Sequence, residues 1–325
     1  MDYIEQVGYI AYTVVGPLVV LAGAGYVLGR RLEAAADVLA KTLLYLLIPV
    51  FVFRNVLTSS LAGPAYGPII GFTAAAVGVL GVLAWGAGRL RGHDRPLGRA
   101  FVNSVILYNS ANFGIPVVAL AFAVAPGERS DAVSAQVMVA VCQGFAAYTL
   151  GAFIAGSGST GAASALKRVL RLPFFYAMMA ALLLKHLYPG AREMDLLLRV
   201  PGLKVVWMPV TLLSEAYVPM ALLTLGAQMG RVRLVRAPAD LAWSAGLRLL
   251  AGPMVGLGLV AAMGLEGMLA QVLVIGLAGP SAVASAVVAI EFRNRPDFAA
   301  SAVLVSTLGA GVTVPIVIFA VQQLF

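Results

Sequence analysis

Charge is the scarcest property of this sequence. Only 11% of its 325 residues are Asp, Glu, Lys or Arg, whereas 61% are hydrophobic. A typical soluble domain is about 25% charged, and small globular proteins keep too much surface to bury so many apolar residues in one core. The composition therefore excludes most soluble enzymes and nucleic-acid-binding modules, and it predicts a polytopic membrane protein.

Cysteine and histidine are almost absent, which removes most candidate catalytic and metal-binding sites. The one cysteine, Cys142, lies inside an apolar run, so neither a disulfide framework nor a cysteine metal site is expected. Neither His93 nor His186 belongs to a His-Glu-x-x-His motif, and the sequence contains no phosphate-binding loop. We therefore expect no enzymatic activity, no resident metal or cofactor, and no ATP-driven pumping by this chain alone.

Long apolar runs, by contrast, follow one another along the whole chain. A helix needs about 20 residues to cross the hydrocarbon layer, and runs this continuous fit helices rather than barrel strands. We predict an all-α membrane protein with ten spans. The spans are Gly8–Gly29, Val38–Thr58, Gly67–Leu90, Phe101–Ala125, Ala132–Ser157, Pro173–Tyr188, Val205–Met229, Leu241–Gly264, Met268–Phe292 and Phe298–Phe325.

The net charge of +8 comes from loops between these spans. Most of the 22 Lys and Arg residues fall in one alternating set of loops, from Arg30 and Arg31 to Arg293 and Arg295. Cytoplasmic loops carry such an excess. We therefore predict a multi-pass protein of the cell membrane with both termini on the extracytoplasmic side, and the basic charge does not call for a nucleic-acid partner.

Proline recurs at matching places in the two halves of the chain. Pro49 and Pro219 are separated by 170 residues, and Pro116 and Pro280 by 164. The shared offset predicts two copies of a five-span unit, although proline is common in membrane helices generally.

The repeats are predicted at residues 1–157 and 173–325, with a small, polar and basic cytoplasmic linker at 158–172. Because five is an odd number, the second repeat enters the membrane upside down. Inverted repeats are typical of secondary transporters, whose sites lie at paired Gly/Pro-interrupted segments.

The fourth and ninth spans contain residues that interrupt helices. Pro116 lacks a backbone donor, Gly114 permits non-helical dihedral angles, and short polar side chains favour local hydrogen bonds. We predict a break in each span, which exposes N–H groups and the positive end of a helix dipole and so favours an anion. The alternative is a proline kink with satisfied neighbours. The predicted binding residues are Asn109, Ser110, Asn112, Gly114, Pro116, Gly279, Pro280, Ser281 and, in the second span, Pro49.

Three segments resemble the auxin efflux carrier family. They are NSANFGIPVV from Asn109, VPMALLTLGAQMG (Val218–Gly230) and the stretch Gly279–Pro315, with its acidic residue Glu291 eleven positions after a proline. Their order and spacing cover most of the chain. The chain looks like a member without the long central loop of the plant carriers.

The resemblance implies a fold of the bile-acid symporter and sodium/proton antiporter type, in which spans four and nine cross. It implies a dimer-forming scaffold of spans 1, 2, 6 and 7, against which spans 3–5 and 8–10 move like an elevator. Members of the family carry small organic anions, either auxins or dicarboxylates such as malate and malonate. By position, Asn109 corresponds to the substrate-contacting asparagine. Ala284 replaces a polar residue of many relatives, which would leave Ser281 or Ser285 as the polar contact.

Charged and polar residues inside spans are functional candidates. Arg248 could neutralise a carboxylate, steady the ninth-span break or extend to the cytoplasmic side. Glu215 could bind a proton or sodium, or cap a broken helix. Gln136, Gln143 and Gln228 are more typical of helix–helix contacts than of ligand sites, although Gln228 is kept as a candidate for coupling.

The hypothesis from the sequence is a secondary carrier of small organic anions, coupled to H⁺, Na⁺ or neither. One alternative is a sodium-coupled symporter of the bile-acid type, and another is a non-transporting membrane sensor or assembly subunit. A sodium/proton antiporter is disfavoured, because every Asp lies at a span end or in a loop.

Overall fold

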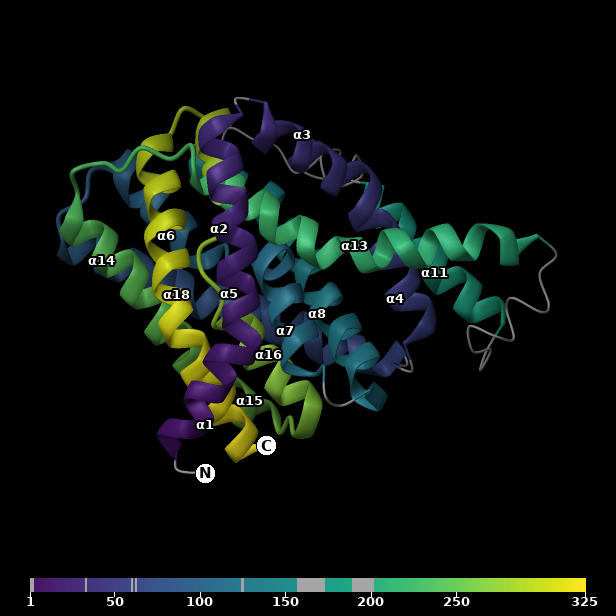
Figure 1. Ribbon diagram of the computed structural model, residues 1–325. Helices are drawn as coiled ribbons and strands as arrows, with labels where there is room; N and C mark the ends of the chain where they lie inside the picture. The colour runs from purple at the N-terminus through teal and green to yellow at the C-terminus, as the bar shows by residue number, and fades with distance from the viewer. Residues whose placement is uncertain are drawn as a thin grey trace.

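The computed structural model describes residues 3–32, 34–59, 61, 63–123, 126–156, 173–188 and 202–325, a region made of helices without a strand (Figure 1). The first half contains α1 (Tyr3–Ile10), α2 (Gly16–Arg31), α3 (Ala35–Thr42), α4 (Ile48–Thr58), α5 (Gly63–Leu90), α6 (Arg95–Ile106), α7 (Ile115–Ala121), α8 (Pro126–Ala146) and α9 (Ala152–Ala155). The second half contains α11 (Pro173–Leu187), α13 (Leu203–Met229), α14 (Pro238–Gly246), α15 (Gly252–Met263), α16 (Gly267–Leu277), α17 (Val283–Glu291) and α18 (Pro296–Leu324). Short π-helical turns extend these helices: η1 (Ala11–Val15), η2 (Leu43–Leu47), η3 (Ser110–Gly114), η4 (Ala147–Gly151) and η5 (Leu247–Ala251).

The described helices fit a polytopic membrane protein. Seven rods, counted through the π-helical turns, are long and apolar enough to cross a membrane, and shorter apolar helices cover Ser110–Ala121, Pro173–Leu187 and Gly267–Leu277. Helices occupy each of the ten predicted apolar runs. The ten crossings and the inverted repeat stay predictions, and the predicted linker at 158–172 lies outside the described residues.

Proline explains four of the five π-helical turns in the described part of the chain. In η1, η2, η3 and η5 a proline is the second residue after the turn, at Pro17, Pro49, Pro116 and Pro253. Proline has no N–H and its ring collides with the carbonyl one turn earlier. A π-helical turn widens the helix at that point and relieves the collision, so the helix bends rather than ends.

The backbones of α2 and α13 approach each other closely. Gly25 and Gly29 of α2 lie against α13, and Gly226 of α13 and Gly230, the residue that follows α13, lie against α2. A Cβ at Gly25 would overlap the carbonyl oxygen of Leu223. Small residues four positions apart allow the two backbones to pack closely. In lipid, such packing drives helix association in place of the hydrophobic effect.

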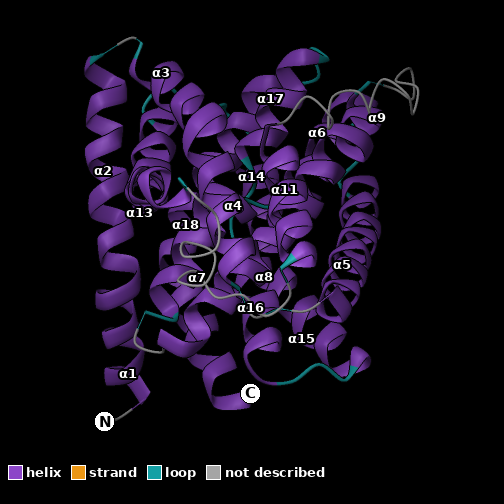
Figure 2. Ribbon diagram, turned by 90° about the vertical axis from the view of Figure 1, so that its right-hand side faces the viewer, coloured by secondary structure: helices purple, strands orange, loops and turns teal. Residues whose placement is uncertain are grey.

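The remaining helices gather into two sets of contacts. In one set α13 packs on α2 and α4, and α11 packs on α4; in the other, α5 contacts α6, α8 and α15, while α16 contacts α8, α15 and α18. Both chain termini lie at the same face of the molecule (Figures 1 and 2). The assignment of that face to the cell exterior, and the division into scaffold and moving helices, stay predictions.

Candidate functional site

The fourth predicted span is broken before its proline. Helix α6 ends at Ile106, Leu107–Asn109 are not helical, and η3 begins at Ser110 and continues into α7. The prediction that Pro116 and Gly114 cause the break was wrong. Pro116 follows the π-helical turn η3 in one continuous helical stretch, and that turn accommodates its missing N–H and its ring. Gly114 has helical dihedral angles (φ −63°, ψ −45°).

The ninth predicted span is broken where the sequence places Gly279, Pro280 and Ser281. Helix α16 ends at Leu277 and α17 begins at Val283, with these three residues in the interval. The two breaks are paired, because Tyr108 and Ser281 form an antiparallel β-bridge.

Backbone hydrogen bonds hold the two breaks together. The Asn109 N–H donates to the Pro280 carbonyl at 2.8 Å, and the Ala282 N–H donates to the Leu107 carbonyl at 2.7 Å. Non-helical backbone at membrane depth must form hydrogen bonds with protein or water. Each break therefore supplies hydrogen-bond partners for backbone groups of the other.

Arg248 donates hydrogen bonds to carbonyl groups at the two helix ends that stop at the breaks. Its guanidinium donates to the carbonyl of Val105 near the end of α6, at 2.6 Å, and to the carbonyl of Leu277 at the end of α16. Its charged carbon also lies 5.0 Å from the centre of the Tyr108 ring. The side chain is fully buried, with 0% exposure, and forms no ion pair among the described residues. The cation therefore neutralises the negative ends of two helix dipoles, and the alternative in which it extends to the cytoplasmic side is wrong.

Gln136 of α8 fills the space between the helices that flank the breaks. Its Nε2 donates to the Ser110 carbonyl at 2.8 Å. A Cβ at Gly114 or at Gly276 would overlap the Gln136 amide group. Gly114 is therefore needed for space rather than for unusual dihedral angles.

A small cavity of about 120 Å³ lies against both breaks. Asn109, Ser110 and Asn112 line it, as predicted for binding residues. The other lining residues are Leu107, Tyr108, Ala111, Gln143, Ala147, Ala282, Val283 and Ala284.

The cavity wall carries unused hydrogen-bond donors. Ala111 and Asn112 at the start of η3, and Val283 and Ala284 at the start of α17, have backbone N–H groups with no acceptor among the described residues. The side-chain donors Asn109 Nδ2 and Gln143 Nε2 are also buried without a partner. Gln143 Oε1 already accepts the Tyr108 N–H at 3.3 Å, which fixes the orientation of that amide. The positive ends of two helices and these donors make the cavity complementary to an anion.

Several predicted residues lie near the breaks without lining the cavity. Ser281 is fully buried, its hydroxyl donates to the Ser104 carbonyl at 2.6 Å, and its N–H donates to Ser306 Oγ at 3.0 Å. The Ser285 hydroxyl donates to the Ala282 carbonyl within its own helix turn. Both hydroxyls are thus used in holding the break. Gly114, Pro116, Gly279 and Pro280 belong to the two broken segments but do not line the cavity.

The candidates on other helices lie outside the cavity wall. Pro49 is in the first turn of α4, Glu215 is exposed on α13, and Gln228 of α13 has a buried Oε1 without a partner. In the described part of the chain, no group of three or more His, Cys, Asp or Glu side chains is placed to hold a metal ion.

Two residues at the site were given no binding role from the sequence. Gln143 was interpreted as a helix–helix contact, because a glutamine in an apolar span gives no sign of where it points. Tyr217 of α13 is buried, stacks on Phe51 of α4 with ring centres 4.2 Å apart, and donates to the Ala111 carbonyl at 3.2 Å. A single tyrosine in an apolar run carries no signal for this contact between α13 and the broken helix.

Comparison with known proteins bears on what this arrangement does. Residues 159–318 match the model of a family described as Membrane transport protein. The match covers most of the second half of the chain. The match confirms the resemblance to the auxin efflux carriers drawn from the motifs.

One relative extends the similarity to the first half of the chain. An uncharacterized transporter from Methanothermobacter thermautotrophicus is 26% identical over 304 residues, which cover 92% of this chain and 94% of the relative. The similarity therefore includes residues before 159, which the family match leaves out.

Proposed function

We propose that the chain is a secondary carrier of small organic anions and that the carboxylate binds in the cavity between the two helix breaks. The observation that carries this proposal is the set of unused donors on one small cavity wall, namely Asn109 Nδ2, Gln143 Nε2 and the first N–H groups of η3 and α17. Donors without acceptors are rare in buried sites. A carboxylate accepts several hydrogen bonds at once and would satisfy them.

The magnitudes favour a bound carboxylate over an empty cavity. A hydrogen bond to a charged group contributes about 1.5–3 kcal/mol, so three or four of them offset several kcal/mol of carboxylate desolvation. Each helix N-terminus adds about 0.3–1 kcal/mol, and more where it is partly buried. The buried cation of Arg248, which stacks on the cavity residue Tyr108, favours the same sign of charge.

The size of the cavity supports a small substrate. Water occupies about 30 Å³ per molecule in the liquid, so the cavity of about 120 Å³ has room for roughly four waters. A carboxylate and a few further atoms fit this space. Malate or malonate would fit with little rearrangement, whereas an auxin-like ring would require residues of the cavity wall to move apart.

Transport requires the site to face each side of the membrane in turn. In our proposal, α5–α9 and α14–α18 move as one group that carries both breaks, and α1–α4, α11 and α13 form the scaffold and the surface of a homodimer. Polar contacts between the two groups include single hydrogen bonds. The Tyr217 hydroxyl donates to the Ala111 carbonyl, and the Ser134 hydroxyl donates to the Asn55 carbonyl. Such contacts can exchange as the groups slide.

Sodium coupling, the first alternative, finds less support at this site. Half-helix carbonyls are the groups that bind Na⁺ in related architectures. Here the carbonyls of Val105 and Leu277 already accept from Arg248. We infer that transport does not depend on sodium, and equal uptake in sodium and potassium buffers would support this inference.

Uptake into proteoliposomes tests the proposal. The probes are radiolabelled malate, malonate and indole-3-acetate, with Asn109→Ala as the test variant. Asn294→Ala is the matched control, because Asn294 is 5% exposed like Asn109, also has an unpartnered Nδ2, and does not line the cavity.

We expect Asn109→Ala to lose most uptake and Asn294→Ala to retain it. Full uptake by Asn109→Ala would contradict the site. Stabilisation of the wild type by a carboxylate without any flux would favour the sensor alternative.

A further inference from the structure

A second, larger groove lies on the outer surface of the moving group, between α5, α6 and α9. Its volume is about 800 Å³, and its floor includes Gly78 and Gly81 of α5. The groove opens toward the membrane, because Val82 and Trp85 on its wall are 69% and 58% exposed. Large apolar side chains exposed on a membrane helix contact acyl chains.

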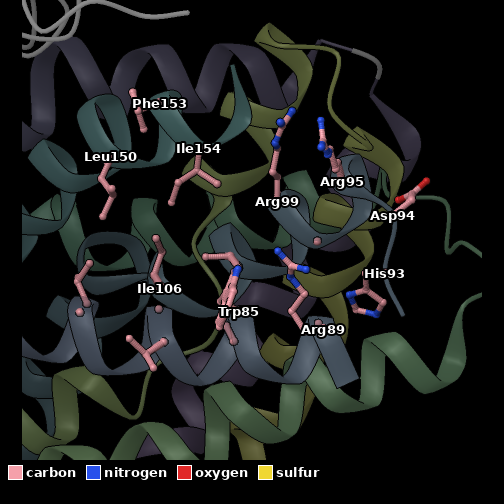
Figure 3. Close-up of a pocket in the computed structure, with 18 residues that line it drawn as sticks. Trp85, Arg89, His93, Asp94, Arg95, Arg99, Ile106, Leu150, Phe153 and Ile154 are labelled. Atoms are coloured by element: carbon pink, nitrogen blue, oxygen red, sulfur yellow. The ribbon is translucent and has the colours of Figure 1, made fainter. Parts of the chain in front are cut away.

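The two ends of this groove differ in character. In Figure 3 the guanidinium groups of Arg89, Arg95 and Arg99 gather at one end, and Ile106, Leu150, Phe153 and Ile154 lie toward the other. Asp94 is the one acidic residue of the lining, and it already accepts from the Leu97 N–H and from Arg295.

The length and position of the groove match one phospholipid. Its basic end coincides with the end of α5 and the start of α6, where membrane helices reach the headgroup region. Val77 lies twelve residues before Arg89 on α5, which is about 18 Å along a helix. Half of the hydrocarbon layer is about 15 Å thick. Arg89 also stacks over Trp85 at 5.2 Å, and such aromatic and basic residues anchor proteins at this depth.

We propose that this groove binds an acidic phospholipid, with the phosphate at Arg89, Arg95 and Arg99 and an acyl chain along the glycine floor of α5. Basic pockets between membrane helices on the cytoplasmic side bind such headgroups. The proposal does not depend on the carried substrate, because none of the residues of this groove lines the cavity between the breaks. The bound lipid would connect α5, α6 and α9 within the group proposed to move.

Two substitutions on one helix separate a lipid from a free anion. A Cβ at Gly78 or at Gly86 meets nothing within 4 Å, and only Gly78 lines the groove. Gly78→Leu therefore fills the acyl part of the groove and keeps every arginine, while Gly86→Leu is the matched control. Both replace glycine by a better helix former.

The measurement is native mass spectrometry of the full chain with phosphatidylglycerol, phosphatidylcholine of the same acyl chains, or sn-glycerol 3-phosphate. We expect the wild type and Gly86→Leu to retain one phosphatidylglycerol with at least tenfold preference over phosphatidylcholine. Gly78→Leu should lose at least fivefold in occupancy, and Arg95→Gln/Arg99→Gln should lose the preference for the acidic headgroup.

Unchanged phosphatidylglycerol binding in Gly78→Leu would overturn the proposal. So would displacement of the lipid by sn-glycerol 3-phosphate, or equal binding of the two lipids by the wild type. Thermal unfolding in detergent reports whether each variant folds. If the double arginine variant does not fold, the comparison of Gly78→Leu with Gly86→Leu decides alone.

Discussion

Arg248 shows how one side chain stabilises two helix breaks. It gives hydrogen bonds to a carbonyl from each broken span, and the Cβ of any residue other than glycine at position 252 would lie 2.5 Å from its Nη2. The π-helical turn η5 and the proline at position 253 set the helix geometry at this point. The cation is therefore a structural partner of the breaks, and in our proposal it favours an anion from behind the cavity wall.

At this scale we predict that Arg248→Gln destabilises the protein more than Arg248→Lys. A buried acceptor left unsatisfied costs about 1–3 kcal/mol, and glutamine removes the charge and has fewer donors on a shorter side chain. Lysine keeps the charge and three donors. Thermal unfolding in detergent measures the order, and an unchanged midpoint for Arg248→Gln would show that the breaks do not need this cation.

The sequence predicted part of the site at residue level. Gly279, Pro280 and Ser281 predicted the second break correctly. Glycine weakens a helix and proline interrupts its hydrogen bonds, so the two together favour a break. Pro116 did not predict the position of the first break. A π-helical turn accommodates this proline, and the helix is interrupted at Leu107–Asn109 instead. The roles of Gln143, Gln136 and Tyr217 depend on which helix faces which, and one sequence contains no information on that pairing.

At the scale of helices, two glycine pairs decide how α2 meets α13. Gly25 has no room for a side chain, whereas a Cβ at Gly23 of the same helix meets nothing within 4 Å. We predict that Gly25→Leu lowers stability by about 1–3 kcal/mol or more through overpacking, and that Gly23→Leu is tolerated. Unfolding midpoints of the two variants check this. Equal midpoints would mean that α2 and α13 do not approach as described.

A capping aspartate predicts a pH dependence for the start of α6. The Leu97 N–H and then Arg295 hold the pKa of Asp94 below its ordinary value. A lowered pKa contributes stability above the pKa of the unfolded chain, and this contribution is lost as the pH falls through the folded-state value.

Asp94→Asn keeps a good N-cap and removes the charge. We predict that the difference in unfolding midpoint between wild type and Asp94→Asn is largest near pH 7 and shrinks as the pH falls below 4. Asp94→Ala, which also loses the cap, should be less stable than Asp94→Asn at every pH. A difference between wild type and Asp94→Asn that grows in acid would contradict the pairing.

For the whole molecule, composition and apolar runs were enough to predict an all-helical membrane protein, because lipid requires internally satisfied helices. The prediction of two groups of helices that move against each other came from a resemblance. Ser134 of α8 donates to the Asn55 carbonyl of α4 at 2.8 Å, across the proposed boundary. Ser104 of α6 and Ser244 of α14 lie 2.8 Å apart, Oγ to Oγ, within the group that we propose moves.

We predict that a disulfide between Asn55→Cys and Ser134→Cys stops anion transport and that its reduction restores it. A disulfide between Ser104→Cys and Ser244→Cys should leave transport unchanged. Both pairs are made in a Cys142→Ser background, which removes the one native cysteine. Full transport with the first pair cross-linked would exclude sliding at this boundary.

The site itself is tested most directly by a structure of the chain with a transported carboxylate bound. We predict carboxylate oxygens about 2.7–3.1 Å from Asn109 Nδ2, from Gln143 Nε2 and from N–H groups at the starts of η3 and α17. A carboxylate bound elsewhere, with the cavity between Tyr108 and Val283 holding only water, would contradict the account.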